Sequence, residues 1–158
     1  MGARNHGHGV FTDAAIDAIH NGALHISQPD ECLREAQYVL LAVKPQMFAE
    51  IGSNIAKYIP GDSLIISIMA GTTLASLRTC FPTHALVRAM PNTPAAIGAG
   101  ITAFTSEQNV SDAQKDTAKA LLSAGGAVHE VASEHLIDVV TAVSGSGPAY
   151  VFHLIETL

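Results

Sequence analysis

Four short loops hold the residues of this sequence that could do chemistry. They read AVKPQ (42–46), SIMAGTT (67–73), MPNTPAAIGAG (90–100) and SGSGPAY (144–150). Small residues, prolines, one lysine and one asparagine dominate them, and none supplies a residue that we can name as a catalytic acid, base or nucleophile. Loops of this kind favour the close approach of a ligand to the backbone.

The AVKPQ loop offers bare backbone and one positive charge. Pro45 biases Lys44 away from helix and removes one amide donor from the loop. Ala42 and Val43 then present a backbone surface that suits a flat ring or a ribose, and Lys44 could neutralise a phosphate. The alternative, which this motif alone favours, is that Lys-Pro only marks the junction between a strand and a helix.

The SIMAGTT loop is built from small residues. Gly71 permits dihedral angles that other residues avoid, so a ligand can come close to the backbone here. Thr72 or Thr73 can cap the helix that follows. A simple capped turn explains the motif at least as well as a binding loop does.

The MPNTPAAIGAG loop carries an amide side chain in a stiff setting. Pro91 and Pro94 bracket Asn92 and Thr93, and a stiff loop loses less entropy when it engages a ligand. Asn92 offers two donors and an acceptor, which suit an amide such as the carboxamide of nicotinamide. A plain rigid turn is an equal alternative.

The SGSGPAY loop leads into an apolar segment. Proline is pre-set for the first position of a helix and needs no N–H partner there, so the motif predicts that a new helix begins with Gly147 as its N-cap. The amide groups at such a start, with the positive end of the helix dipole behind them, could hold an anion. The alternative, which we favour, is an elbow between two domains.

Residue spacing excludes several other kinds of site. The serine-hydrolase pattern G-x-S-x-G is not met, because Ala142 stands two residues before Ser144, and Ser144 stands two before Ser146. No phosphate-binding P-loop pattern occurs. The histidines are dispersed apart from His6 and His8, so we expect no metal site.

Composition indicates a globular domain with an aliphatic core. The 158 residues are 48% hydrophobic and only 14% charged, which distinguishes the chain from disordered proteins. A net charge of −6 with scattered basic residues argues against nucleic acid as the main partner. No signal peptide and no apolar run of membrane-spanning length is evident. Cys32 and Cys80 lie far apart, which favours a reduced, cytoplasmic protein over one with a disulfide.

Unbroken apolar runs alternate with segments of helical period. An unbroken run is typical of a strand that is buried on both faces, and apolar residues at every third or fourth position are typical of a helix. We expect strands at residues 37–43, 63–69, 84–90, 99–105 and 127–131. We expect helices at residues 12–22, 47–59, 72–80, 111–125, 134–143 and 148–158.

This order of elements predicts an α/β fold with a mostly parallel sheet and helices on both faces. Ligands of such sheets bind outside the carboxyl ends of the strands. The loops that contain Lys44 and Asn92 should therefore line a common cleft. Asp138, which lies within the apolar run HLIDVV, is expected to face solvent.

The four loop motifs, in this order and at these separations, resemble pyrroline-5-carboxylate reductase, the enzyme of the last step of proline biosynthesis. The motifs are AVKPQ, SIMAGTTL, VRAMPNTPAAIGAG and TAVSGSGPAYVFHLIE, and the resemblance covers roughly residues 28–158. Each motif alone is modest, but the four together are highly specific for this family.

The resemblance implies a reductase that transfers hydride from NADPH or NADH to the C=N bond of 1-pyrroline-5-carboxylate and forms L-proline. It implies an incomplete Rossmann-like domain at residues 1–143 and the start of an all-helical dimerisation domain at residues 144–158, with a homo-oligomer in the full-length form. Arg4 and Asn5 would meet the adenosine 2′-phosphate of NADPH. The other implied cofactor contacts are Ala42, Val43, Lys44, Pro45, Ile68, Met69, Ala70 and Asn92, the last near the nicotinamide.

The sequence also departs from the family pattern at both ends. The opening strand and the G-x-G-x-x-G-like turn that cradles the pyrophosphate are missing. The chain stops eleven residues into the interdomain helix, counted from Pro148 to Leu158. The Gly-Gly-Thr-Thr segment that holds the substrate carboxylate in the family is therefore absent. We expect a chain truncated at both ends and inactive alone; the alternative is a non-catalytic nucleotide-binding or interaction fragment.

Overall fold

The computed structural model describes residues 22, 23, 26 and 28–158. The helix expected at residues 12–22 lies almost wholly outside the described residues. The proposed cofactor contacts Arg4 and Asn5 also lie outside them.

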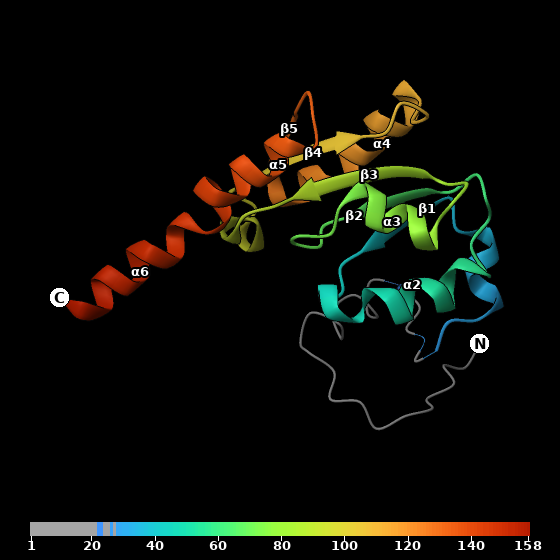
Figure 1. Ribbon diagram of the computed structural model, residues 1–158, viewed down its shortest axis with the longest axis horizontal. Helices are drawn as coiled ribbons and strands as arrows, with labels where there is room; N and C mark the ends of the chain where they lie inside the picture. Colours follow the sequence, from blue (N-terminus) through green and yellow to red (C-terminus); the bar gives the residue numbers. More distant parts are fainter. Residues whose placement is uncertain (1–21, 24–25, 27) are drawn as a thin grey trace.

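A five-stranded sheet forms the centre of the described structure (Figure 1). Its strands follow one another in space as they do in sequence, in the order β1-β2-β3-β4-β5. They are β1 (Tyr38–Leu41), β2 (Leu64–Ser67), β3 (Ala85–Met90), β4 (Gly100–Ser106) and β5 (Gly126–Glu130).

The sheet is mostly parallel, as the sequence predicts, with one antiparallel pairing. Strands β1, β2 and β3 run parallel, and β5 runs parallel to β4, but β4 pairs antiparallel with β3. The connection from β3 to β4 contains only the short 3-10 helix η3 (Thr93–Ile97). A parallel crossover requires about a dozen residues or more, so this short connection turns the chain back on itself.

Helices pack on both faces of the sheet, which confirms the predicted α/β fold. On one face, α2 (Phe48–Ala56) and α3 (Leu74–Cys80) cover side chains of the first three strands. On the other face, α4 (Asp112–Leu122) packs against Phe104 and the alternate residues of β2 and β3. Strand β2 has Leu64, Ile65 and Ile66 without exposed surface, as expected for a strand covered on both faces.

Local signals set the ends of these helices. Thr73 caps α3 and accepts a hydrogen bond from the Ser76 N–H at 3.1 Å. Ser111 caps α4 in a reciprocal capping box with Gln114. The remaining short 3-10 helices are η1 (Glu31–Glu35), η2 (Pro45–Met47) and η4 (Ser123–Gly125).

The C-terminal segment is one continuous helical run. It comprises α5 (His135–Val140), the π-helical segment η5 (Thr141–Gly145) and α6 (Gly147–Thr157), and α6 projects away from the sheet (Figure 1). The predicted N-cap at Gly147 is wrong, because the preceding Ser146 is itself helical, with φ −89° and ψ −30°. The Ser146 N–H bonds to the Thr141 carbonyl at 2.8 Å. The wider π turn accommodates Pro148, whose ring would clash with a carbonyl inside a regular α-helix.

This continuity removes the basis for an anion site at the SGSG loop. A separate helix start would point unpaired amide groups outward, but here the N–H groups of Ser146 and Ala149 bond to carbonyls of the same helical run.

Among the described residues, no helix is long and apolar enough to cross a membrane.

One buried histidine gives the fold a pH dependence. His84, just before β3, is only 5% exposed, and its ring meets the Phe81 ring edge-on. Burial lowers the pKa of His84, opposed in part by the backbone carbonyls of Ile59 and Pro60. The folded state therefore favours the neutral ring, so its stability is full above the unfolded pKa of about 6.5 and declines as the pH falls below it.

We predict that the free energy of unfolding falls as the pH is lowered from 7 to 5, and that His84→Met removes much of this fall. Urea denaturation at a series of pH values measures the effect. His129→Gln changes an exposed histidine of β5 and serves as the control, with an unaltered pH dependence. The same pH dependence in His84→Met as in the unchanged chain would contradict the prediction.

Candidate functional site

The parallel strands bring three of the four loops to one edge of the sheet. Leu41, Ser67 and Arg88 stand opposite one another across β1, β2 and β3. The Ile68 N–H donates to the Leu41 carbonyl at 3.1 Å, which extends the pairing one residue beyond β2. The loops 42–45, 68–73 and 90–92 therefore follow one another along this edge, which we call the carboxyl edge.

The loop after β1 leaves the sheet in an extended conformation. Lys44 has φ −64° and ψ 135°, as expected for a residue before proline, and Pro45 begins η2. Ala42, Lys44 and Pro45 are exposed, while Val43 is partly buried against the core. Within the described part of the chain, no ion pair involves Lys44. The loop thus presents a free positive charge beside accessible backbone.

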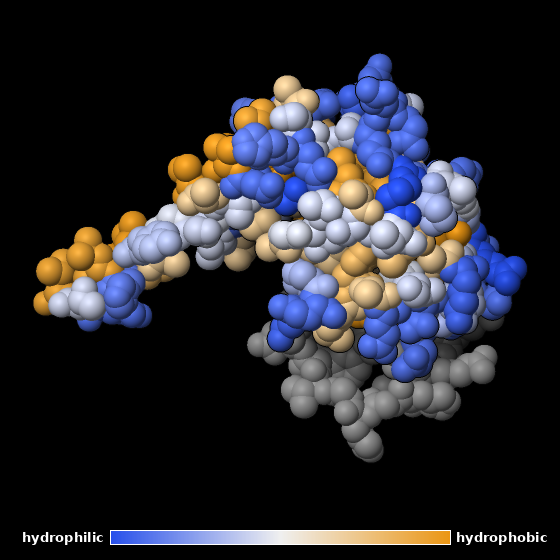
Figure 2. Space-filling model, viewed as in Figure 1, coloured by the Kyte–Doolittle hydropathy of each residue, from blue (hydrophilic) through white to orange (hydrophobic). Residues whose placement is uncertain are grey.

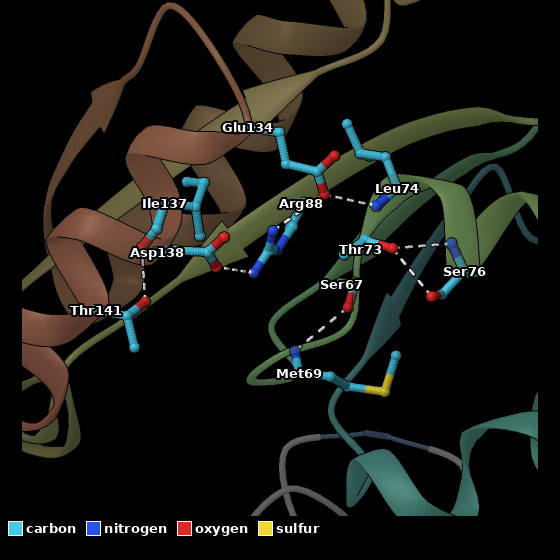
Figure 3. Close-up of polar contacts among 10 residues, drawn as sticks. All are labelled: Ser67, Met69, Thr73, Leu74, Ser76, Arg88, Glu134, Ile137, Asp138 and Thr141. Carbon is cyan, nitrogen blue, oxygen red and sulfur yellow. Dashed lines mark hydrogen bonds and ion pairs between the residues drawn. The ribbon is translucent and has the colours of Figure 1, made fainter.

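The loop after β2 turns sharply at the same edge. The Ser67 hydroxyl accepts a hydrogen bond from the Met69 N–H at 3.2 Å (Figure 3). Gly71 takes the left-handed conformation, with φ +69°, that the turn requires. Met69 is buried in the core and Ile68 is half-buried, whereas Ala70 is exposed. A ligand would reach the backbone of this loop more readily than the Met69 side chain.

The loop after β3 holds the amide of Asn92 in a defined orientation. Asn92 Oδ1 accepts a hydrogen bond from the Ile101 N–H at 2.9 Å, at the start of β4. The identity of the donor fixes the orientation of the carboxamide, because an N–H group requires an oxygen acceptor. Within the part of the chain that the structure describes, no hydrogen bond engages Asn92 Nδ2, whose two N–H donors are therefore open to a ligand.

Tight packing holds the Asn92 loop against the sheet. Ala95, in η3, lies so close to β4 that a Cβ placed on Gly100 would come within 2.6 Å of the Ala95 Cα. A side chain at Gly100 would therefore push the loop away from the sheet. The stiffness predicted from Pro91 and Pro94 is accordingly strengthened by contacts with strand residues.

An ion cluster around a buried arginine near the carboxyl edge was not predicted. The Arg88 side chain is 3% exposed, and its Nη1 and Nη2 pair with Glu134 Oε1 at 3.0 Å and Asp138 Oδ1 at 2.7 Å (Figure 3). Asp138 is thus more than half exposed, as expected from its sequence context, but it also pairs with Arg88. The overlooked signal was an arginine inside the apolar run HALVRAM, since a buried charge requires a partner.

The described residues offer no other obvious centre of chemistry. No group of three or more His, Cys, Asp or Glu side chains among them is placed to hold a metal ion. Cys32 and Cys80 are both free thiols. The groups that meet at the carboxyl edge are accessible backbone, a lysine and an oriented amide, which are binding groups rather than reacting ones.

Two family models match the sequence. Residues 134–158 match the pyrroline-5-carboxylate reductase dimerisation family, and residues 13–71 match the family described as NADP oxidoreductase, coenzyme F420-dependent.

Curated relatives match most of this chain. The pyrroline-5-carboxylate reductase of Synechocystis is 48% identical over 128 residues, which cover 81% of this chain and 47% of that protein. The enzyme of the same name from Pseudomonas aeruginosa is 39% identical over 150 residues, which cover 94% of this chain and 52% of that protein. The chain therefore spans about half the length of these relatives.

Solved structures show the same likeness. The pyrroline-5-carboxylate reductase of Coxiella burnetii is 31% identical with a TM-score of 0.81, over 93% of this chain and 56% of that one. The Plasmodium falciparum enzyme, solved with NADP bound, is 33% identical with a TM-score of 0.76, over 85% of this chain and 51% of that one. The resemblance stated from the four loop motifs is thus confirmed in sequence and in fold.

We predict that Asn92→Ala lowers the free energy of unfolding by about 1 kcal/mol, because the Ile101 N–H loses its acceptor. Asn92→Asp keeps an acceptor oxygen and should be closer to the unchanged chain. Urea denaturation at pH 7 measures both, and Asn54→Ala, at an exposed position of α2, is the control. Full stability in Asn92→Ala would show that the bond to Ile101 does not hold this loop.

Proposed function

From its likeness to the pyrroline-5-carboxylate reductases, we propose that the chain is part of an NAD(P)H-dependent reductase acting on the C=N bond of 1-pyrroline-5-carboxylate. One observation carries the proposal. Three of the four loops that give the sequence its resemblance to the family follow one another along the carboxyl edge, where ligands of parallel α/β sheets bind. Because the chain spans about half the length of its relatives, catalysis is expected to need residues beyond it.

The carboxyl edge offers several of the contacts that a nicotinamide cofactor needs, although not the glycine-rich turn that holds its pyrophosphate in the family. Exposed Ala42 and Pro45 leave room for a ribose or a ring, and the free charge of Lys44 suits a phosphate. Because the Asn92 oxygen is engaged by Ile101, its Nδ2 would be the atom that donates to the carbonyl oxygen of the carboxamide. The proposed cofactor-binding residues are Ala42, Val43, Lys44, Pro45, Ile68, Met69, Ala70 and Asn92, together with Arg4 and Asn5 for the 2′-phosphate.

In this reaction the protein positions its ligands rather than reacting with them. When bound, the reduced nicotinamide supplies the hydride, which the imine carbon accepts while the ring nitrogen gains a proton, giving L-proline. The backbone of loops 42–45 and 68–70 would fix the cofactor, and Asn92 would orient its ring. The source of the proton lies outside the residues that we can assign.

The C-terminal helical run suits an interface between subunits. We propose that residues 1–143 form the nucleotide-binding domain and residues 144–158 begin a dimerisation domain of a homo-oligomeric, cytoplasmic enzyme. The match to the dimerisation family supports this, although the division falls within the continuous helical run. Figure 2 shows hydrophobic residues gathered on the projecting α6. Exposed apolar side chains there are Tyr150, Val151, Phe152, Leu154, Ile155 and Leu158.

The partial coverage of the relatives also supports a second candidate. The chain could act as a non-catalytic fragment that binds a nucleotide or a partner through α6. The two candidates differ in whether this stretch of sequence supports hydride transfer once the rest of a reductase is supplied.

A titration with NADPH, followed by backbone amide NMR, tests cofactor binding. We predict weak binding, with NADPH-induced shifts at residues 42–45, 68–70 and 90–92. Lys44→Gln should weaken the binding several-fold, because it removes one charge beside the phosphates. Lys57→Gln, at an exposed position beyond α2, should not. Shifts confined to other parts of the chain, or tight saturable binding by this chain alone, would contradict the account.

A chimera separates the two candidate functions. The 128 residues of this chain that match the Synechocystis relative replace the corresponding segment of that protein, and reduction of 1-pyrroline-5-carboxylate by NADPH is measured. We predict a folded, active chimera in which Asn92→Asp lowers the activity at least several-fold. A folded chimera that binds NADPH but does not reduce the imine would favour the non-catalytic alternative.

A further inference from the structure

Arg88 fixes the place of α5 against the sheet. Its guanidinium group donates to Glu134 Oε1 at 3.0 Å and to Asp138 Oδ1 at 2.7 Å (Figure 3). These two carboxylates stand four residues apart, one helical turn from each other. The planar guanidinium group pairs with one carboxylate on each of two successive helical turns. It therefore sets both the rotation of α5 and the position of α5 along the helix axis, which a flexible lysine could not do.

Glu134 extends the same anchor to α3. Its Oε1 atom also accepts a hydrogen bond from the Leu74 N–H at 2.7 Å. Leu74 begins α3, directly after the loop 68–73 of the carboxyl edge. One carboxylate oxygen therefore joins β3, α5 and the end of a proposed cofactor-binding loop.

Because α5 and η5 belong to one helical run, the position of α5 also determines where η5 lies beside the end of β3. The π-helical segment η5 begins directly after α5, and a Cβ placed on Gly145 would lie 3.5 Å from the Met90 Cε. Met90 stands two residues before Asn92. The segment 141–145 is thus held beside the loop that carries the proposed nicotinamide contact.

A purely stabilising role explains this cluster poorly. Only the Arg88 side of the cluster is buried, whereas Glu134 and Asp138 are 32% and 61% exposed, and both surface and buried ion pairs often contribute little net stability. Their geometric demands are stricter, because each charge must meet its partner at the right distance and angle. Arg88 also lies in the carboxyl-terminal half of β3, on the side of the molecule where the ligand loops gather.

We propose that Arg88 is a positioning residue of the reductase site, which sets where residues 141–145 lie relative to Asn92. This inference rests on the proposed function. Arg88 is buried beneath the edge and acts through α5 and η5 rather than by touching cofactor or substrate. Through α5 and η5, Arg88 determines the position of the groups that would contact the nicotinamide end of the cofactor.

The substitution Arg88→Lys tests the positioning role in the chain itself. It keeps the positive charge but removes the planar guanidinium group that pairs with both carboxylates. The matched control is Arg78→Lys in α3, whose side chain reaches the residue just before the N-terminal end of β3. There Arg78 donates to the carbonyls of Phe81, Pro82 and His84 and pairs with Glu107. Two quantities are measured: amide hydrogen exchange in residues 135–146 without ligand, and amide shifts induced by NADPH.

In Arg88→Lys we expect exchange in residues 135–146 to become about tenfold faster, because α5 is no longer anchored. The NADPH-induced shifts at residues 90–92 should fall several-fold, while those at residues 42–45 persist. Arg78→Lys should show neither change at these positions. If Arg88→Lys does not fold, Asp138→Asn, at the exposed side of the cluster, is measured in its place. The same two changes, faster exchange and smaller shifts at residues 90–92, are then expected to be smaller.

Two results overturn the proposal. One is unchanged exchange in residues 135–146 in the Arg88 variant. The other is a parallel loss of the shifts at 42–45 and 90–92, which a general loss of structure produces. If the unchanged chain shows no NADPH-induced shifts at all, the proposed function fails, and the exchange measurement alone decides whether Arg88 positions α5 and η5.

Discussion

The parallel register of β1, β2 and β3 is the constraint on which the arrangement of this molecule depends. Because these strands start in register and run in the same direction, the segments that follow them emerge at one edge, although they are separated by helices in the sequence. The register is held by burial on both faces of β2, whose Leu64, Ile65 and Ile66 have no exposed surface. A slip of one residue would turn these side chains to the wrong faces and separate the loops.

A second layer of order comes from polar groups that hold the loops to the sheet. Asn92 binds the start of β4 through its oxygen, Ser67 binds the turn after β2, and Arg88 binds α5. Each bond lies at or near the carboxyl edge. The apolar core therefore builds the sheet, and a few polar contacts set the shape of the edge, where orientation matters more than stability.

Sequence reasoning predicts the parts of this structure that depend on local pattern. Unbroken apolar runs such as YVLLAV and SLIISIM identify the strands, but only the second is buried on both faces, because β1 lies at the margin of the sheet with Tyr38 and Leu40 exposed. Ser111 and Thr73 are recognisable caps because capping needs only a hydroxyl at the right position. It does not predict that β4 runs antiparallel, which the short connection after β3 decides. The helix expected from residue 148 is present as α6, but its continuity with α5 was not predicted, because the π turn between them has no simple sequence signal.

The same distinction applies to the candidate site, where some residues can be predicted from local sequence pattern and others depend on the fold. Lys44 and Asn92 can be proposed from their place after apolar strands, but the engagement of Asn92 by Ile101 depends on a turn that only the fold reveals. The partnership of Arg88 with Glu134 and Asp138 joins residues some fifty positions apart, beyond the reach of any local pattern. The sequence feature that could have indicated this ion cluster is the charged residue Arg88 within an otherwise apolar strand, because a buried charge needs a partner.

A crystal structure of the chain soaked with NADPH tests the central claim most directly. The account predicts the nicotinamide ring at the carboxyl edge, with its carboxamide oxygen within hydrogen-bond distance of Asn92 Nδ2. A cofactor bound at the opposite edge of the sheet, or with Asn92 turned away from it, would contradict the account.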